Sequence, residues 1–429
     1  MALKNHLINS KEHGVYDILP EQVETWDYLV AEIRASLDST GYRKMVSSMT
    51  EKEDTFTKKV LEALNIPDKN QLLTIRKRNK DSLVMTPPGP VGLLRCALEQ
   101  NIIDPEEPLK VYNYGMALVD EDNDDTTEPR QFHVFKVENI GDLTPVRDAE
   151  MILTIYRLLE DLGIPNLVVN INSLGTKECR EAYYSEICSR AGKRYSNVCQ
   201  QHRNDPIRLY SELQSQVTEM NLALPFIVDH LGPVASAHFK VILEFLDTLE
   251  VPYAMDPMMR GSYGFNDTTY FEIVSQDDPG IVLARGGRHN NLLHEMGGLP
   301  EWGALGTEIY VDTILKRVWK EKQVKMSKNK AQVFVASIGQ EGQKNALKIL
   351  SLMQKQGVEV ADGFGIKSLK QQISKARKHK VPITLIIGRK EALDGTVILR
   401  DKMSDNQETV PIDKLLGIIE QKLSEVDKV

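Results

Sequence analysis

Cysteine is scarce in this chain. Four of the 429 residues are cysteines, and they are widely spaced: Cys96, Cys179, Cys188 and Cys199. In a chain of this length such spacing excludes a disulfide framework and indicates a reducing compartment. Cys199 and His202 stand close together, but no second pair of ligands accompanies them, so we expect no metal site.

Long apolar runs are also absent. No stretch approaches the roughly eighteen apolar residues of a membrane-spanning helix, and no cationic and apolar leader opens the sequence. We therefore expect a cytoplasmic protein without a membrane partner. The net charge of -8 argues against a general coat on nucleic acid and is compatible only with a local basic face. With 41% hydrophobic and 27% charged residues, the composition is typical of soluble globular proteins.

Arginine is missing from one long segment. Between the predicted strands Lys110–Leu118 and Phe132–Glu138 lies the acidic stretch VDEDNDDTTEP, residues 119–129, and no arginine occurs from Lys110 to Pro129. A solvated hairpin tip is the simplest interpretation. A weak cation site is the alternative, but the glycine turn and distal glutamate of a calcium loop are absent.

The length predicts two or three structural units. Lys316–Lys330 is rich in lysine and glutamate, which predicts a linker at residues 321–330 between a domain at 1–320 and another at 331–429. Helical periodicity predicts helices at Glu21–Ser39, Val91–Glu99, Asp148–Leu162 and Ala237–Leu249. After residue 331 strand and helix patterns alternate, which predicts a sheet covered by helices.

The sequence predicts a β-hairpin with arginines near both ends. The strands Tyr270–Val274 and Ile281–Ala284 are joined by the polar turn Ser275–Gly280, with Arg260 upstream and a glycine turn, Gly286-Gly287-Arg288, downstream. Glycines after a strand let a backbone approach a ligand, and arginines supply donors for a carboxylate or phosphate. An ordinary tight turn with solvated arginines is the alternative.

Several motifs resemble the histidyl-tRNA synthetase family, a class II aminoacyl-tRNA synthetase family. Arg260-Gly261, Phe271-Glu272 and Gly286-Gly287-Arg288 match its histidine-binding pattern of Arg-Gly-Leu-Asp-Tyr-Tyr, Phe-Glu and Ala-Gly-Gly-Arg-Tyr-Asp. Further matches are Asp17-Ile18-Leu19-Pro20 at the family's opening, Arg130-Gln131-Phe132-His133 in motif 2, Gly306 and Glu308 in motif 3, and Lys367-Ser368-Leu369-Lys370 and Thr409-Val410-Pro411 in the anticodon-binding domain.

The resemblance runs from Gly14 to Leu423 and implies an α+β fold. We expect an antiparallel class II sheet core, a helical insertion at about residues 176–238 and a C-terminal α/β anticodon-binding-type domain, assembled as a homodimer. It also implies an amino-acid or ligand pocket, with Arg260 as the candidate catalytic residue. The remaining pocket residues are Arg130, Glu138, Gly286, Gly287 and Arg288.

Four family positions are substituted. Pro88 replaces a glutamate that holds the α-ammonium group of the amino acid, and Val134 replaces a glutamine that contacts it. Val119 and Ile309 replace the arginines of motifs 2 and 3, which grip the phosphates of ATP. Valine and isoleucine offer no donor and no charge. The pattern predicts a paralogue with altered catalytic motifs.

The resemblance therefore leaves several functions open. We favour a protein that cannot form histidyl-adenylate and that acts by binding tRNA or a protein. An active histidine–tRNA ligase, which would use ATP and Mg²⁺, is the alternative, and a regulatory subunit in histidine biosynthesis is a further one. A pocket rebuilt for another ligand also remains open.

A basic cluster occurs near the C-terminus of this acidic protein. A solvated helix face and RNA phosphate contact are both compatible with it, and the resemblance favours the second. Its members are Lys367, Lys370, Lys375, Arg377, Lys378 and Lys380.

Overall fold

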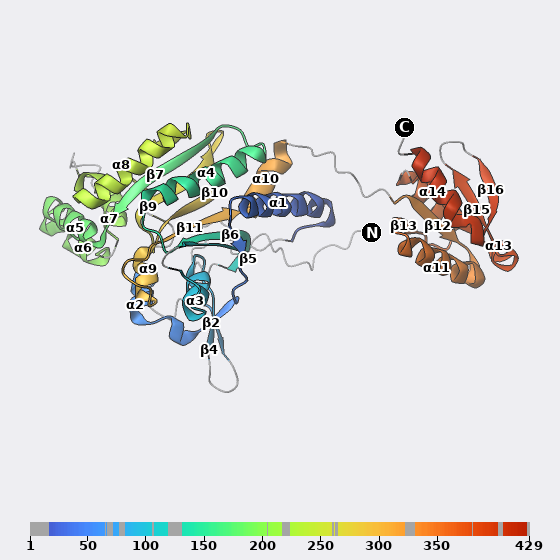
Figure 1. The fold of residues 1–429 in the computed structure, drawn as a ribbon, viewed down its shortest axis with the longest axis horizontal. Coiled ribbons are helices and arrows are strands. Elements are labelled where there is room, and N and C mark those ends of the chain that lie inside the picture. Colours follow the sequence, from blue (N-terminus) through green and yellow to red (C-terminus); the bar gives the residue numbers. More distant parts are fainter. Residues whose placement is uncertain are drawn as a thin grey trace. The chain divides into compact units, whose positions relative to one another are not determined.

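The computed structural model describes residues 17–64, 66, 72–76, 82–104, 107–118, 131–203, 205–216, 224–259, 261, 265–321, 331–379, 381–401 and 406–426. The chain divides into two compact units, Met1–Val324 and Lys325–Val429 (Figure 1). Among the described helices, none combines the length and the apolar character that crossing a membrane requires.

An eight-stranded sheet forms the centre of the first unit, in the order β1-β5-β6-β11-β10-β9-β7-β8. The inner pairs are antiparallel, and the outermost pairs β1–β5 and β7–β8 are parallel. This confirms the expected antiparallel-rich core. The strands are β1 (Arg43–Lys44), β5 (Leu109–Leu118), β6 (Gln131–Ile140), β7 (Leu167–Gly175), β8 (Tyr253–Met255), β9 (Asp267–Ser275), β10 (Asp278–Arg288) and β11 (Ala304–Tyr310).

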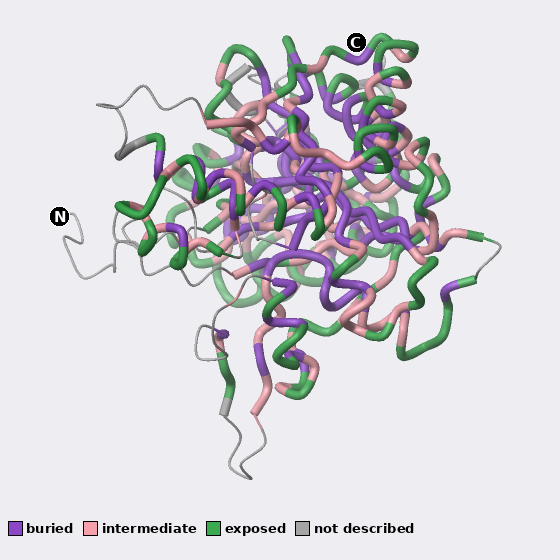
Figure 2. Tube along the Cα trace, turned by 90° about the vertical axis from the view of Figure 1, so that its left-hand side faces the viewer, coloured by how far each residue is buried: buried purple, intermediate pink, exposed green. Residues whose placement is uncertain are grey.

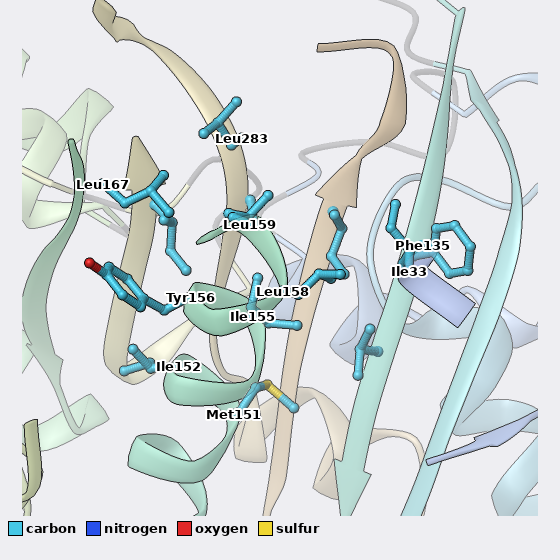
Figure 3. Packing of buried hydrophobic residues seen from close by; sticks show 14 of the residues in the cluster. Ile33, Phe135, Met151, Ile152, Ile155, Tyr156, Leu158, Leu159, Leu167 and Leu283 are labelled. Atoms are coloured by element: carbon cyan, nitrogen blue, oxygen red, sulfur yellow. The ribbon is translucent and has the colours of Figure 1, made fainter. Parts of the chain in front are cut away.

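Four helices cover one face of this sheet: α1 (Pro20–Ser39), α4 (Pro145–Asp161), α8 (Pro233–Thr248) and α10 (Val311–Glu321). Their apolar residues recur at helical spacing, as Leu29, Ile33 and Leu37 do on α1, and all three are fully buried. Figure 3 shows Leu159 of α4 packed beside Leu283 of β10. In Figure 2 the buried residues follow the strands and the inner sides of the helices.

A smaller sheet adjoins the large one in the order β2-β4-β3. Its strands are β2 (Thr50–Lys52), β3 (Thr74–Arg76) and β4 (Ser82–Met85), and a second apolar core joins it to α2 (Lys58–Ala63), α3 (Val91–Glu99) and α9 (Asn290–Glu295). The loop between β4 and α3 contains Pro87-Pro88-Gly89-Pro90.

Helices also fill the segment between β7 and α8. They are α5 (Lys177–Ala191), α6 (Ser196–Gln201), α7 (Pro206–Gln216) and the short turns η4 (Lys193–Tyr195) and η5 (Ile227–His230), and they share an apolar core of their own. The mostly helical pattern expected for residues 176–238 agrees with this arrangement, although α8 already begins at Pro233.

The glycine turn predicted for the first unit was wrong. Gly286-Gly287-Arg288 is the end of β10 and not a turn, because its backbone pairs with both β9 and β11. Asn172–Gly175 belongs to β7 and pairs with β9. Helix α10 extends to Glu321, the first residue of the linker predicted at residues 321–330.

The second unit is an α/β domain whose sheet has the order β13-β12-β14-β15-β16. Strands β12 (Val333–Ser337), β13 (Val360–Asp362) and β14 (Ile383–Ile387) are parallel, whereas β15 (Thr396–Asp401) and β16 (Gln407–Pro411) add antiparallel hairpin strands. The helices are α11 (Gly339–Lys355), α12 (Leu369–Lys378), α13 (Arg389–Asp394) and α14 (Leu415–Val426), and η6 (Ile412–Lys414) precedes the last. Sequence reasoning missed the six-residue α13 and the mostly exposed β16.

Candidate functional site

The face of the large sheet opposite the four helices carries a pocket. Successive strand residues point to opposite faces. Val137 on β6 packs into the helix-covered core, so its neighbours Lys136 and Glu138 point to the other face. The pocket walls come from several strands, the loop before α3 and the start of α9, and they include Gly89, Glu138, Phe265, Arg285, His289 and Glu308.

Charges of opposite sign alternate across this face. The sheet register places Glu272, Arg285, Glu308 and Lys136 side by side on β9, β10, β11 and β6. We call these four residues the charged row. Directly opposed residues lie close enough to interact. Each cation of the row therefore has a carboxylate neighbour, and Arg285 lies between two of them.

Lys136 is held close to two carboxylates. Burial lowers the pKa of its ammonium group, and the charges of Glu308 and Glu138 oppose that shift. Its Nζ lies 3.5 Å from the Pro87 carbonyl oxygen, to which it donates. The ammonium group is therefore engaged inside the protein.

Glu138 pairs with an imidazole of the same chain. Its Oε2 lies 3.0 Å from Nε2 of His289, and both side chains are almost completely buried. Burial raises the pKa of Glu138, and His289 opposes the shift. The ring of Phe265 meets the His289 ring edge to face, with the centroids 5.9 Å apart.

Two glycines allow these groups to approach the backbone. A Cβ at Gly306 would overlap Oε1 of Glu138, and one at Gly89 would lie 2.7 Å from the Phe265 ring. Gly89 also has a φ of +97°, which disfavours other residues. Its N–H donates to Oε1 of Glu308 at 2.8 Å, and the Tyr310 hydroxyl donates to Oε2 at 2.8 Å.

Comparison with known proteins identifies the family. A family model described as "Histidyl-tRNA synthetase" matches residues 14–314, and one described as "Anticodon binding domain" matches residues 332–422. The chain belongs to the histidyl-tRNA synthetase family. This confirms the resemblance inferred from the motifs and the class II fold.

Relatives of this family match along almost their whole length. The histidine–tRNA ligase of Caldicellulosiruptor bescii is 28% identical over 416 residues, which cover 96% of this chain and 98% of the relative. That of Desulforamulus reducens is 27% identical over 421 residues, covering 97% and 100%.

Two solved structures share the fold. The apo histidyl-tRNA synthetase of S. aureus has a TM-score of 0.72 and 22% identity, covering 97% of this chain and 100% of its own. A Bacillus halodurans C protein, described as an ATP phosphoribosyltransferase regulatory subunit/histidyl-tRNA synthetase, has a TM-score of 0.63 and 16% identity, covering 87% and 96%.

The arginine of the family's Gly-Gly-Arg pattern does not enter the pocket in this chain. The guanidinium of Arg288 is buried on the opposite face, where it donates to Asp148 at 2.6 Å and to the carbonyl oxygens of Asp142 and Thr144 at 2.7 and 2.8 Å. Burial favours a raised pKa of Asp148, but Arg288 and His238 outweigh it, so that pKa is low. Arg288 is therefore a structural residue, contrary to the sequence prediction.

The structure replaces Arg288 with Arg285 as the pocket arginine. Three positions along a strand reverse the face, so Arg285 and Arg288 cannot both line it. Sequence reasoning missed Arg285 because it ended the strand at Ala284; continued alternation through Arg288 would have been the signal. Gly286 does line the pocket, and the carbonyl oxygen of Gly287 lies 3.3 Å from Nδ1 of His289.

The substituted family positions fall into different surroundings. Val134 is 1% exposed and packs with Ala117, Phe132 and Tyr310 in an apolar patch on the pocket face of the sheet. Ile309 is fully buried on the helix-covered face. On this strand Glu308 and Tyr310, and not Ile309, face the pocket side.

Of the other residues that the sequence predicted for the site, only Pro88 lies within the described part of the first unit. Pro88 is buried in the loop before α3, next to the pocket residue Gly89. Arg130, Arg260 and Val119 lie outside the described residues, as does the acidic stretch 119–129.

The basic cluster of the second unit lies on and beside α12. Lys367, Lys370, Lys375, Arg377 and Lys378 are all exposed, whereas Lys380 lies outside the described residues. We call these five exposed residues the α12 basic face. Gln372 holds the helix against β12, since its side chain accepts from the Ser337 N–H and donates to the Ser337 carbonyl oxygen, both at 2.9 Å.

Proposed function

We propose that this chain is a histidyl-tRNA synthetase-like protein that does not form histidyl-adenylate and that acts by binding, with tRNA as the favoured partner and a protein as the other. The observation that carries the proposal is the charged row. Both of its cations, Arg285 and Lys136, have glutamates as cross-strand neighbours.

The chemistry of adenylation explains why the charged row matters. Its transition state gathers negative charge on a phosphate, and donors already aimed at that charge stabilise it. Loss of one such donor costs on the order of 10²–10³ in rate. In this pocket an entering triphosphate would meet Glu138 and Glu308, and it would have to draw the cations away from their carboxylates.

The substituted positions point in the same direction. The apolar patch around Val134 offers no hydrogen-bond donor beyond the Tyr310 hydroxyl, and that hydroxyl already donates to Glu308. The costs of several lost contacts need not add. We therefore include ATP and Mg²⁺ only in the active alternative. In the described part of the chain, no group of three or more histidine, cysteine or acidic residues could hold a metal ion.

The α12 basic face supports tRNA as the partner. The helix sequence LKQQISKARK contains four cations and no acidic residue. Exposed lysines and arginines bind phosphates without reading base sequence. We further propose, from the family resemblance, a homodimer in the cytoplasm.

The active ligase remains the second candidate, because relatives described as histidine–tRNA ligases match across 98–100% of their lengths. A regulatory role has one supporting neighbour, the Bacillus halodurans C protein, whose likeness concerns the fold alone. We rank it below tRNA binding because the chain has an anticodon-binding domain.

Histidine-dependent exchange of pyrophosphate into ATP tests the proposal directly. We expect no exchange above background by the purified protein, with an active histidyl-tRNA synthetase measured alongside. A Glu138→Ala variant is the contamination control, since exchange that survives it unchanged comes from another enzyme. Exchange near the rate of the active enzyme, lost in the variant, would overturn the proposal in favour of the ligase.

A further inference from the structure

His289 lines the pocket and lies against its buried carboxylate, Glu138. It follows β10, and the first residue of α9 follows it. Its side chain is 1% exposed and lies against Glu138 and Phe265. We infer that His289 is a built-in occupant: its imidazole fills the place at Glu138 that the imidazole of a ligand such as L-histidine would need. This inference rests on the proposed function, because it gives a reason why histidine is not activated.

Both nitrogens of the ring are already used. Nδ1 lies 3.3 Å from the Gly287 carbonyl oxygen, which can only accept, so Nδ1 carries the proton. Nε2 lies 3.0 Å from Oε2 of Glu138. This carboxylate oxygen therefore already has a ring nitrogen of the same chain as its neighbour, and a ligand would have to displace that nitrogen to reach it.

The surroundings fit a planar ring. Gly306 leaves room for the Glu138 carboxyl to lie flat against β11, and Gly89 lets the Phe265 ring approach the loop before α3. Phe265 then closes on the ring of His289 at an interplanar angle of 89°. Carboxylate, carbonyl and aromatic edge together form a complete imidazole site.

The backbone holds His289 in this site. Its N–H donates to the Ala304 carbonyl oxygen at 2.9 Å. The next residue, Asn290, donates to Asp267 at 3.1 Å and accepts from the Ala304 N–H at 2.9 Å. Because these bonds fix the start of α9, a ligand cannot displace the ring without breaking a buried pair.

The sequence departs from the family at this point. The family pattern Gly-Gly-Arg-Tyr-Asp has a tyrosine after the arginine, and this chain has His289 after Arg288. The substitution therefore introduces an imidazole next to the pocket's buried carboxylate. A tyrosine at this position would put no imidazole there.

Binding of free imidazole tests the inference. A His289→Ala variant leaves a ring-sized space beside Glu138, so imidazole in the millimolar range should raise its melting temperature saturably, by about 2–4 °C. The parent protein should not respond. The double variant His289→Ala, Glu138→Gln should lose the response, because the amide does not replace the carboxylate as an acceptor of the same strength.

His294→Ala is the matched control. His294 is also on α9, but its Nε2 lies 2.8 Å from the Trp302 carbonyl oxygen and meets no pocket carboxylate. Imidazole should not stabilise this variant. If the His289→Ala variant does not fold without ligand, the yield of refolded protein in the presence of imidazole is measured instead. Pyrazole at the same concentration is the control, because it has a similar ring but is a much weaker base.

The outcomes separate this inference from the proposed function. A saturable response confined to His289→Ala supports it, as does refolding that imidazole promotes and pyrazole does not. A folded variant without response, an equal response in the parent or His294→Ala, or failure of imidazole to promote refolding overturns it. Pyrophosphate exchange by the parent would overturn the proposed function, whatever imidazole does to the variant.

Discussion

The pocket face of the large sheet and the α12 basic face contain similar charged residues in opposite situations. In the pocket, Arg285 and Lys136 alternate with glutamates along the charged row, and Glu138 pairs with His289. On α12 the lysines and the arginine are exposed, and the helix has no acidic residue. The difference suggests that the pocket uses its charges to hold itself together, whereas α12 can present them to a phosphate backbone.

Residue type alone therefore does not decide whether a cation is available to bind an anion. A half-buried cation between carboxylates, such as Arg285, must break existing interactions before it binds an anion, and this offsets much of the gain. An exposed cation gives up only water and counterions.

Removal of the buried anion behind the sheet should have the largest effect. Asp148→Ala leaves the guanidinium of Arg288, which is 1% exposed, without its carboxylate. Loss of one partner of a buried pair costs about 3–5 kcal/mol, so the free energy of unfolding should fall by that much. Urea denaturation followed by tryptophan fluorescence measures it, because Trp26, Trp302 and Trp319 all belong to the first unit.

The control is Glu160→Ala, which breaks the exposed pair with Arg157. Exposed pairs contribute little, so this change should leave the unfolding curve where it is. Equal effects of the two variants would contradict the structural role of Arg288.

The close contact at Gly306 should have the next largest effect. A methyl group there would meet the Glu138 carboxyl, so Gly306→Ala must displace a buried, paired group at a cost of about 1–3 kcal/mol. The same fluorescence-detected denaturation gives the change. Gly280→Ala is the matched strand control, because nothing lies within 4 Å of the added atom; a loss at Gly280 as large as at Gly306 would argue against the contact.

Charge reversal on α12 tests the other side of the comparison. Lys367→Glu with Lys370→Glu should weaken tRNA binding by about tenfold or more at low salt and reduce its salt dependence, because phosphate contacts are lost. Fluorescence anisotropy with labelled tRNA at several salt concentrations measures both. Lys348→Glu, at an exposed position of α11 in the same domain, is the control. Unchanged binding in the double variant would mean that the α12 basic face is only solvated.

The smallest expected effect is a pH dependence of stability that arises from the buried carboxyl group of Asp312. Burial raises the pKa of Asp312 to about 6, above its value near 4 in an unfolded chain. Its side chain accepts from the His133 N–H and lies 3.2 Å from His133 Nδ1. Between these two pKa values the folded state keeps a proton that the unfolded state has released. Stability should therefore decline as pH rises from about 4 to about 6.

Asp312→Asn removes this titration. The variant should gain about 1 kcal/mol relative to the parent over that pH range, a value discounted for relaxation around the site. Denaturation at a series of pH values measures it, and Asp161→Asn, at an exposed position, should follow the parent. A constant difference between Asp312→Asn and the parent across the range would rule out the titration.

Much of the fold was predictable because its signals are local. The helix predicted at Val91–Glu99 is found at the same residues as α3, and the helix predicted at Glu21–Ser39 is found as α1, which begins one residue earlier. Strong periodicity and nearby prolines or glycines specify such elements without tertiary contacts. The hairpin of β9 and β10 was predicted, but the length of β10 was not. Gly286 and Gly287 weaken the strand pattern in the sequence. In the structure the strand continues through them because β10 pairs with β9 on one side and with β11 on the other.

The candidate site was predictable only in part. Glu138 and Gly286 were expected in the pocket and line it, whereas Arg288 was expected there and lies on the other face. His289 and Arg285 were missed because neither residue has a distinctive local pattern. The role of His289 is visible only from its contact with Glu138. The role of Arg285 is visible only from its position between the glutamates of β9 and β11.

The sequence by itself determined the family, the order of the two units and most helices, because motifs and periodicity act over short distances along the chain. Only the tertiary structure decided which side chains meet. His289 and Glu138 are 151 residues apart, and Arg288 and Asp148 are 140 apart. Such pairs depend on sheet register, and a shift of one residue would turn every side chain of a strand to the other face.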